Sequence, residues 1–261
     1  MERLNNRAVN EMRPLEFVLN VAPHATASVL CCFGNTRVIC AVNIEEDVPR
    51  WMKAQKVEGG WLTAEYAMLP YSTLERKKRD SAAGKQDGRS VEIQRLIGRS
   101  LRAVMDLDAL GPRTVWIDCD VLQADGGTRT ASITGSAVAL AIALNRIMAK
   151  GLITQNPMRQ LVSAVSVGKL NGTPILDLCY EEDRDAEVDM NVVMTEGGQY
   201  VEVQGSGEEA VFTAEEMAQM LSLASQGIAA ITRAQKEAIA RADAPTEDDF
   251  NSLKDFFTGV K

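Results

Sequence analysis

Histidine is nearly missing from this chain of 261 residues, which contains only His24. One imidazole disfavours a two-histidine nuclease, a histidine-rich zinc site and a Ser-His-Asp triad. Because His24 follows a proline in a turn-like stretch, we expect it to line a loop and not to catalyse. If the chain is an enzyme, carboxylates, arginines and a bound divalent cation must supply its chemistry.

Paired cysteines, an apolar leader and a membrane-length apolar run are also missing. The five cysteines are an odd set without a Cys-x-x-Cys motif, and they lie in strand-like stretches, which indicates buried thiols and a reducing compartment. No run of about 18 apolar residues is present, and residues 1–6 lack the apolar centre of a signal peptide. We therefore expect a cytoplasmic protein with no membrane partner.

Positive charge is scarce overall but unevenly distributed. The net charge of −8 argues against a chain that binds nucleic acid over its whole surface. Residues 71–102 nevertheless contain nine lysine and arginine residues against four acidic ones, whereas residues 181–261 contain six against eighteen. Because a polyanion responds to the local potential, an acidic protein can still present a basic binding face.

The chain is organised around residues 118–131, DCDVLQADGGTRTA. A run rich in β-branched and aromatic residues predicts a strand over 113–121, and small apolar residues predict a buried helix over 131–150. The two glycines between them permit a tight turn that approaches a ligand closely. Free N–H groups at the helix start and the guanidinium of Arg129 would bind an anion there. The alternative is a structural turn without a ligand.

The basic region opens with residues 73–80, TLERKKRD, in a turn-rich segment. This run is either a solvated turn or a phosphodiester-binding patch, and the nearby Lys85 and Arg89 favour the second interpretation. Apolar side chains at i, i+3 and i+4 then predict a buried helix over 90–105 with Ser90 as its N-cap. Three arginines share another face of this helix, which faces either solvent or a partner: Arg95, Arg99 and Arg102.

Six carboxylates are concentrated in residues 181–191, EEDRDAEVDMN, between two predicted strands. Asp189 and Asn191 share one face of a strand, and Asp183 can approach them across a bend. A hard cation such as Mg²⁺ often takes one or two carboxylates and completes its shell with water and substrate phosphate. The alternative is a charged solvent loop. Phosphoryl transfer requires an anion site and a carboxylate group together, which favours the metal.

The remaining pattern predicts two related halves. Hairpins are expected over 28–42, 162–179 and 188–204, and a capping box at Thr213 and Glu216 opens a last helix. We predict one catalytic domain over residues 1–241 and an acidic tail over residues 242–261.

These strings together resemble the ribonuclease PH family of phosphate-dependent 3′→5′ exoribonucleases, from about Arg13 to Ile239. The strings that carry the resemblance are long and rare: WLTAEYAMLP at 61–70, GKQDGR at 84–89, EIQRLIGR at 92–99, residues 118–131, and AEVDMN at 186–191. The resemblance implies an α/β (α+β) fold of two βαβ-like halves, the ribosomal protein S5 domain 2-like fold, with mixed sheets and packed helices. One departure is Gly205-Ser206-Gly207, where the family usually has Gly-Thr-Ala.

The resemblance also assigns residues to roles. Inorganic phosphate, the co-substrate, is expected on Arg89, Gly127, Thr128 and Arg129. The metal and catalytic carboxylates, where Mg²⁺ or another divalent cation binds, are expected to be Asp183 and Asp189. The RNA is expected on Arg76, Arg79 and Arg99. Asp183 is the candidate acid and Asp189 the metal ligand, and these two roles could be exchanged.

The implied activity is phosphorolytic trimming of RNA 3′ ends, of transfer RNA precursors in particular and also of ribosomal RNA, with release of nucleoside diphosphates. The implied assembly is a homohexameric ring, a trimer of dimers. The first alternative is a non-catalytic RNA-binding subunit of an exosome-like ring. The second is a small-molecule kinase, which is disfavoured because no Gly-x-x-x-x-Gly-Lys-[Ser/Thr] is present.

Overall fold

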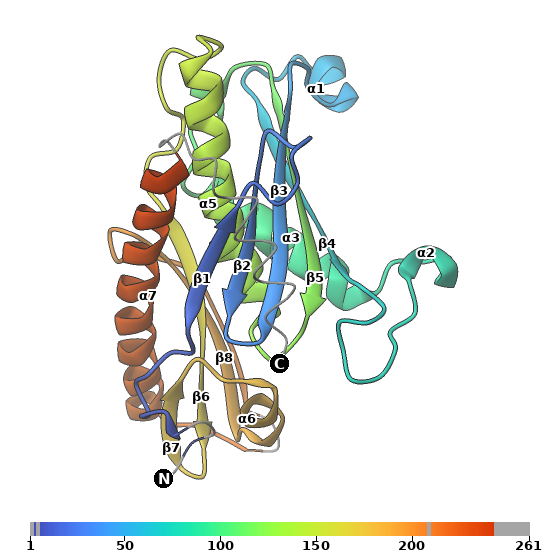
Figure 1. Ribbon diagram of the computed structural model, residues 1–261. Helices are drawn as coiled ribbons and strands as arrows, with labels where there is room; N and C mark the ends of the chain where they lie inside the picture. Colours follow the sequence, from blue (N-terminus) through green and yellow to red (C-terminus); the bar gives the residue numbers. More distant parts are fainter. Residues whose placement is uncertain (1–2, 4–5, 208–209, 243–261) are drawn as a thin grey trace.

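The computed structural model describes residues 3, 6–207 and 210–242 and contains two β-sheets with helices between and beside them (Figure 1). The long helix α5 (Thr128–Ala149) packs between the sheets, against β2 and β3 on one side and β6 on the other. The last helix, α7 (Ala214–Ala242), covers the second sheet along β6 and β7. The acidic tail predicted beyond α7 lies outside the described residues.

The first sheet has five strands in the order β1-β2-β3-β5-β4. They are β1 (Leu15–Leu19), β2 (Ala27–Phe33), β3 (Thr36–Glu45), β4 (Trp61–Met68) and β5 (Thr114–Gln123). Neighbours pair antiparallel except β4 and β5, which are parallel and are joined through α3 (Gly88–Arg102). This half therefore contains a βαβ unit. The single histidine, His24, is exposed in the loop between β1 and β2, as expected.

The second sheet has four antiparallel strands in the order β7-β6-β8-β9. They are β6 (Val162–Leu170), β7 (Thr173–Leu176), β8 (Val188–Thr195) and β9 (Tyr200–Gly207). Strands β7 and β8 both oppose β6, so they are parallel to each other, and α6 (Tyr180–Asp185) connects them. This is a βαβ-like half with β6 between the parallel strands. The predicted two-halved α/β fold with packed helices is confirmed; the first sheet is mixed and the second is antiparallel.

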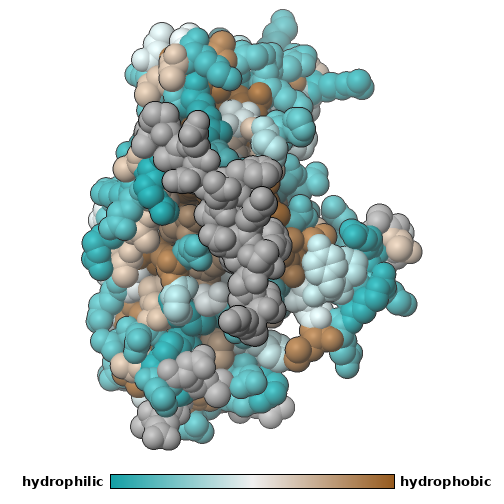
Figure 2. Space-filling model, in the orientation of Figure 1, coloured by the Kyte–Doolittle hydropathy of each residue, from teal (hydrophilic) through white to brown (hydrophobic). Residues whose placement is uncertain are grey.

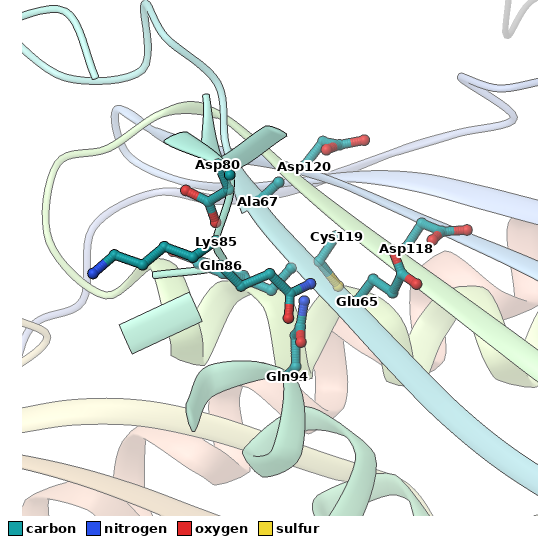
Figure 3. A pocket seen from close by; sticks show the side chains of 11 residues that line it. Glu65, Ala67, Asp80, Lys85, Gln86, Gln94, Asp118, Cys119 and Asp120 are labelled. Carbon is teal, nitrogen blue, oxygen red and sulfur yellow. The ribbon is translucent and has the colours of Figure 1, made fainter. Parts of the chain in front are cut away.

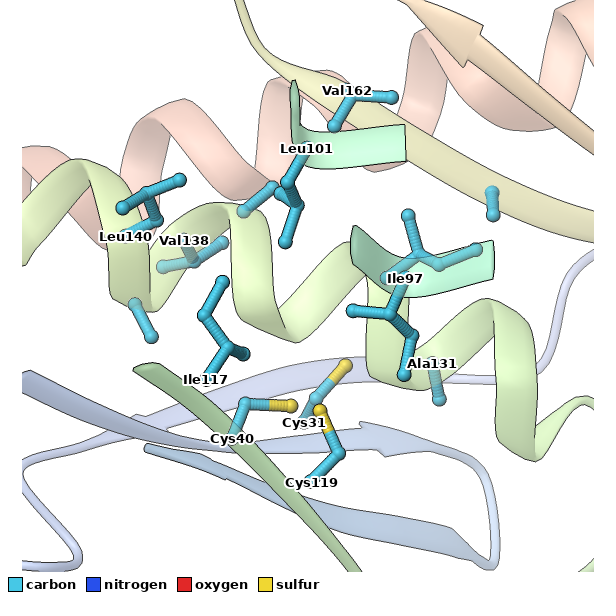
Figure 4. Close-up of a cluster of buried hydrophobic side chains, with 14 of the residues drawn as sticks. Cys31, Cys40, Ile97, Leu101, Ile117, Cys119, Ala131, Val138, Leu140 and Val162 are labelled. Atoms are coloured by element: carbon cyan, nitrogen blue, oxygen red, sulfur yellow. The ribbon is translucent and has the colours of Figure 1, made fainter. Parts of the chain in front are cut away.

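The core forms around the small residues of α5, whose side chains allow close packing against the first sheet (Figure 4). A Cβ added at Gly135 would lie 2.7 Å from Cβ of Cys31 and 2.8 Å from Sγ of Cys40. Burial raises the pKa of both thiols well above its usual range. By length and composition α5 could cross a membrane, but 83% of its apolar window is buried inside the protein. It is therefore the core helix of this fold.

Three short helices complete the structure: α1 (Arg50–Gln55), α2 (Asp80–Ala83) and α4 (Leu107–Leu110). The predicted helix over 90–105 has different ends. Its N-cap is Asp87, whose carboxylate accepts a hydrogen bond from the backbone N–H of Arg89, so Ser90 lies buried within the first turn and the helix ends at Arg102. The Thr213–Glu216 capping box is confirmed by reciprocal hydrogen bonds of 2.8 and 3.2 Å.

The acidic run forms a helix and not the predicted bend between two strands. Strand β7 ends at Leu176, before the predicted residue 179, because Asp177 adopts a left-handed φ of 56° that turns the chain out of the sheet. Cys179 then becomes the N-cap of α6, and its N–H donates to the carboxylate of Glu182 at 3.1 Å. Asp183 consequently lies on a helix, whereas Asp189 lies on β8.

Candidate active site

The glycine turn, Gly126 and Gly127, joins β5 to the first residue of α5. Both glycines have left-handed φ values, 74° and 67°, a region that residues with a Cβ rarely adopt. A Cβ at Gly126 would also lie 2.6 Å from the carbonyl oxygen of Leu178. The N-cap of α5 is Gly127, which has no side chain that could cap the helix. The first N–H groups of a helix have no partner within the helix and attract an anion, which makes the start of α5 a candidate anion site.

Two arginines flank the start of α5. Arg129 belongs to its first turn, and Arg89 lies at the start of α3. The hydroxyl of the buried Tyr66 lies 2.9 Å from Oγ1 of Thr128. Burial raises the pKa of Tyr66, and the hydrogen bond with Thr128 and the charges of Arg89 and Arg129 oppose this shift. Both guanidinium groups thus act electrostatically on Tyr66, whose hydroxyl lies beside the first residue of α5.

The two predicted carboxylates come together beside these arginines. Burial raises the pKa of Asp189 to about 6, the charge of Asp183 adds to the shift, and the charges of Arg129 and Arg89 oppose it. The side-chain amide of Asn191 donates to Asp189 at 3.4 Å, as expected for residues on one strand face. The fold therefore brings four residues from α3, α5, α6 and β8 into one electrostatic group.

A metal at this group would depend on few protein ligands. Among the described residues, no cluster of three or more His, Cys, Asp or Glu side chains is arranged to hold a metal ion. Asp183 and Asp189 are two neighbouring carboxylates whose mutual repulsion a cation relieves. That donor set fits a Mg²⁺ ion that obtains its other ligands from water and phosphate oxygens.

Gln204 and Glu92 also belong to the site, although the sequence reasoning assigned no role to either. Arg129 Nη1 donates to Gln204 Oε1 at 2.7 Å, and Gln204 Nε2 donates to Glu92 Oε1 at 3.1 Å. Arg129 Nη1 also lies 3.8 Å from Glu92 Oε1. The sequence marks both residues. Glu92 is the first residue of the family-like string at 92–99, and Gln204 directly precedes the departure at Gly205-Ser206-Gly207.

Two of the predicted RNA-binding residues lie outside this group. Arg76 and Arg79 are exposed in the segment between β4 and α3, which projects from the body of the protein and is largely hydrophilic (Figures 1 and 2). Lys77 donates to Asp87 at 3.1 Å. This contact ties the projecting segment to the start of α3, where Arg89 lies, so the basic patch is adjacent to the site.

Arg99, the third predicted RNA-binding residue, forms a two-pronged ion pair with Glu202. The pair joins α3 to β9, and the side chain of Arg99 remains 41% exposed. A groove of about 350 Å³ beside it is lined by Gly88, Glu92 and Arg95 among others. Arg99 thus lies on the same face of α3 as Glu92, next to the strand that carries Gln204.

The cavity beside the edge strand β4 is distinct from the group of residues at the start of α5. It has a volume of about 680 Å³, and Glu65, Asp118 and Asp120 line it (Figure 3). Burial and the charge of Glu65 raise the pKa of Asp118, and burial raises the pKa of Asp120 against the charge of Arg79. These carboxylates disfavour phosphate in this cavity, so the start of α5 remains the candidate anion site.

Comparisons with known proteins agree with the fold and the motifs. The models of the 3′ exoribonuclease family match residues 11–144 (domain 1) and 160–227 (domain 2). A ribonuclease PH of Corynebacterium kroppenstedtii is 54% identical over 239 residues, which cover 92% of this chain and 93% of that protein.

Solved structures share the fold at lower identity. Rice (Oryza sativa) Rrp46 has a TM-score of 0.71 at 20% identity, over 92% of this chain and all of that one. A chain of the Archaeoglobus fulgidus exosome with RNA bound to the active site has a TM-score of 0.73 at 21% identity, over 90% and 92% of the two chains. The two family models cover most of the chain, and the bacterial relative is similar over nearly its whole length. This chain therefore belongs to the 3′ exoribonuclease family.

Proposed function

We propose that this chain is a phosphorolytic 3′→5′ exoribonuclease that trims the 3′ ends of transfer RNA precursors and releases nucleoside diphosphates. The observation that carries the proposal is the convergence of Arg89, Arg129 and the start of α5 with Asp183 and Asp189. An anion site beside a pair of carboxylates is the arrangement that phosphoryl transfer uses. The 54% identity to a ribonuclease PH over 92% of the chain supports the same activity.

Inorganic phosphate would bind between Arg89, the N–H groups that follow Gly127, the hydroxyl of Thr128 and Arg129. One of its oxygens attacks the last phosphodiester phosphorus, a new P–O bond forms, and the bond to the 3′ oxygen of the preceding nucleotide breaks. Arg129 stabilises the charge on the phosphoryl oxygens. Holding both reactants in this geometry removes much of the entropic cost of the bimolecular step.

The leaving 3′ oxygen takes up a proton, and the raised pKa of Asp189 supports this carboxyl as its source. The surroundings of Asp189 stabilise its protonated form, because burial and the charge of Asp183 raise its pKa to about 6. A cation on Asp189 would lower that pKa. If Asp189 is the acid, Mg²⁺ must be held mainly by Asp183. This assignment is the reverse of the first one from the sequence, in which Asp183 was the acid and Asp189 the metal ligand. When bound, Mg²⁺ would neutralise charge on the phosphoryl oxygens.

The RNA would run over the basic segment with Arg76 and Arg79 and past Arg99 to reach the carboxylates. We also propose a homohexameric ring, a trimer of dimers, in the cytoplasm. The fold shared with exosome chains supports a ring, and five buried free cysteines support a reducing compartment.

The test is incubation of the purified protein with Mg²⁺ and a transfer RNA carrying extra 3′ nucleotides, with and without inorganic phosphate. Nucleoside diphosphates that appear only with phosphate are the expected product. Release of monophosphates without phosphate would mean hydrolysis and would overturn phosphorolysis. Binding of RNA without release of any nucleotide would instead indicate a non-catalytic ring subunit.

A further inference from the structure

Five charged side chains form a buried cluster beneath the glycine turn and α6. We call this the buried arginine cluster, and its members are Arg3, Arg7, Arg13, Asp177 and Glu182, each at most 7% exposed. Burying a charge is costly, and replacing a buried ion pair by apolar residues is often neutral or stabilising. Stability alone therefore does not explain this cluster. Its contacts with the glycine turn and with α6 point to a role in the site.

One end of the cluster supports the glycine turn. Arg13 binds Asp177 with two prongs, Nε to Oδ2 at 3.0 Å and Nη2 to Oδ1 at 2.7 Å, and its Nη1 donates to the carbonyl of Asp125. A Cβ added at Gly127 would lie 3.3 Å from Nη2 of Arg13. Arg13 is therefore in direct contact with the turn that precedes α5.

Thr36 of β3 supports the same turn from the first sheet. This fully buried hydroxyl accepts a hydrogen bond from the N–H of Asp125 at 2.9 Å and donates one to the carbonyl of Gly126 at 2.6 Å. Thr36 and Arg13 thus fix the two peptide groups that lead into the anion site.

The other end of the cluster fixes α6. Arg3 donates to both oxygens of Glu182, at 2.9 and 2.8 Å, and Arg7 donates to Oε2 at 2.8 Å. Both arginines also donate to the carbonyl of Asp177, at 3.2 and 3.0 Å. Glu182 directly precedes Asp183, so the cluster determines where α6 presents the carboxylate of Asp183.

A further contact joins the two ends. The N–H of Tyr180, the first residue of α6, donates to Oδ1 of Asp125 at 3.1 Å. The phosphate side and the carboxylate side of the site therefore share one rigid base, although they come from different sheets.

We infer that Arg13, Asp177 and Thr36 are positioning residues for phosphate, and that Arg3, Arg7 and Glu182 are positioning residues for Asp183. The inference rests on the proposed phosphorolytic function. Displacements of about 1 Å in a reacting geometry cost up to roughly 100-fold in rate, and a site must be held to within about 0.5 Å by residues behind it. The cluster and Thr36 supply that support to the glycine turn and α6 at once.

The first experiment measures binding of inorganic phosphate to the full chain by titration calorimetry without RNA, together with kcat and KM for phosphate. We expect Thr36→Val and Arg13→Lys to weaken phosphate binding and raise KM for phosphate by roughly tenfold, with a smaller change in kcat and unchanged affinity for RNA. Thr36→Ser keeps the hydroxyl and should restore wild-type values.

The second experiment uses Arg3→Lys, which loses the two-pronged bond to Glu182 and keeps the charge. We expect kcat to fall while KM for phosphate stays within about twofold. The matched control is Arg146→Lys. Arg146 also donates to a carbonyl and an amide, Thr26 O and Asn20 Oδ1, but lies about 27 Å along α5 from its start.

Unchanged phosphate binding in both Thr36→Val and Arg13→Lys would overturn the inference. The inference would also be overturned if Arg146→Lys, at a similar loss of thermal stability, lost as much phosphate binding as these two variants. If the wild type releases no diphosphates, the proposed function fails, but the calorimetric comparison still decides whether these residues position the anion site.

Discussion

Arg129 of α5 and Gln204 of β9 are joined by a 2.7 Å hydrogen bond, which links the helix after the glycine turn to the edge strand of the second sheet. The same amide donates to Glu92 of α3. Gln204 therefore holds the guanidinium in one orientation between three elements. The family departure at Gly205-Ser206-Gly207 lies directly beyond this contact.

Replacing Arg129 should lower phosphate-dependent nucleotide release more than replacing Gln204. Arg129→Ala should lower phosphate-dependent release by at least roughly 100-fold, because it removes the group that stabilises the developing charge. Gln204→Ala leaves that group in place without its orienting partner, so we expect a loss of about tenfold with a higher KM for phosphate. Single-turnover assays check both, with the exposed Arg233→Ala on α7 as control. Wild-type phosphorolysis in Arg129→Ala would refute its assignment.

The projecting basic segment is expected to bind the RNA backbone. Arg76→Ala/Arg79→Ala should weaken RNA binding and reduce the slope of log K against log salt by about 1.4, because each single-strand phosphate contact contributes about 0.7. The binding of inorganic phosphate should stay unchanged. Filter binding between low and high salt measures the slope. A control pair of exposed basic residues, Lys150→Ala/Arg233→Ala, should change neither value. An unaltered slope in the first variant would mean that the segment is only a solvated turn.

Glu182 should make the stability of the fold depend on pH. Burial raises its pKa, but the hydrogen bonds from Arg3 and the N–H of Cys179 outweigh this, so the folded-state pKa lies below the ordinary value of 4.5. Its ionised form thus contributes stability that is present above pH 4.5 and is lost as the pH falls through the lower folded-state pKa. Urea unfolding at pH 7 and below pH 4.5 should show this loss.

Glu182→Gln should lower the free energy of unfolding at pH 7 by about 3–5 kcal/mol, because it leaves two buried guanidinium groups without a carboxylate. Its stability should also vary less below pH 4.5 than that of the wild type. The exposed neighbour Glu181 provides the control, and Glu181→Gln should behave like the wild type. Equal acid sensitivity in all three proteins would contradict the role of Glu182.

Gly135 should be required for the packing of α5 on the first sheet. Gly135→Ala forces a methyl group to within 2.8 Å of Cys31 and Cys40, and overpacking of this kind costs about 1–3 kcal/mol. Gly88 in α3 has no neighbour within 4 Å of an added Cβ, so Gly88→Ala should be neutral or stabilise the fold slightly. Thermal unfolding compares the two. Equal stability of both variants would mean that the core tolerates the added methyl.

Local patterns predicted much of this protein. The β-branched and aromatic run of β5, the two glycines and the small-residue run of α5 predicted a strand, a turn and a buried helix in the observed order, because each depends on neighbours in the chain. The rare strings predicted the fold and the family. The resemblance also named Arg89, Arg129, Asp183 and Asp189, which the structure brings together. Metal and phosphate occupancy at these residues stays a prediction.

Other features depend on contacts between distant parts of the chain and were not predictable in this way. The acidic run became a helix because Asp177 turns the chain after β7 and Glu182 meets Arg3, which lies 179 residues earlier. The pairing of Arg129 with Gln204 required α5 and β9 to meet across two sheets. The sequence alone determined which residues carry charge and where the long strands and helices, such as β5 and α5, form. Only the tertiary structure decided which charges are buried together, because burial and the distances between charges arise when the sheets pack around α5.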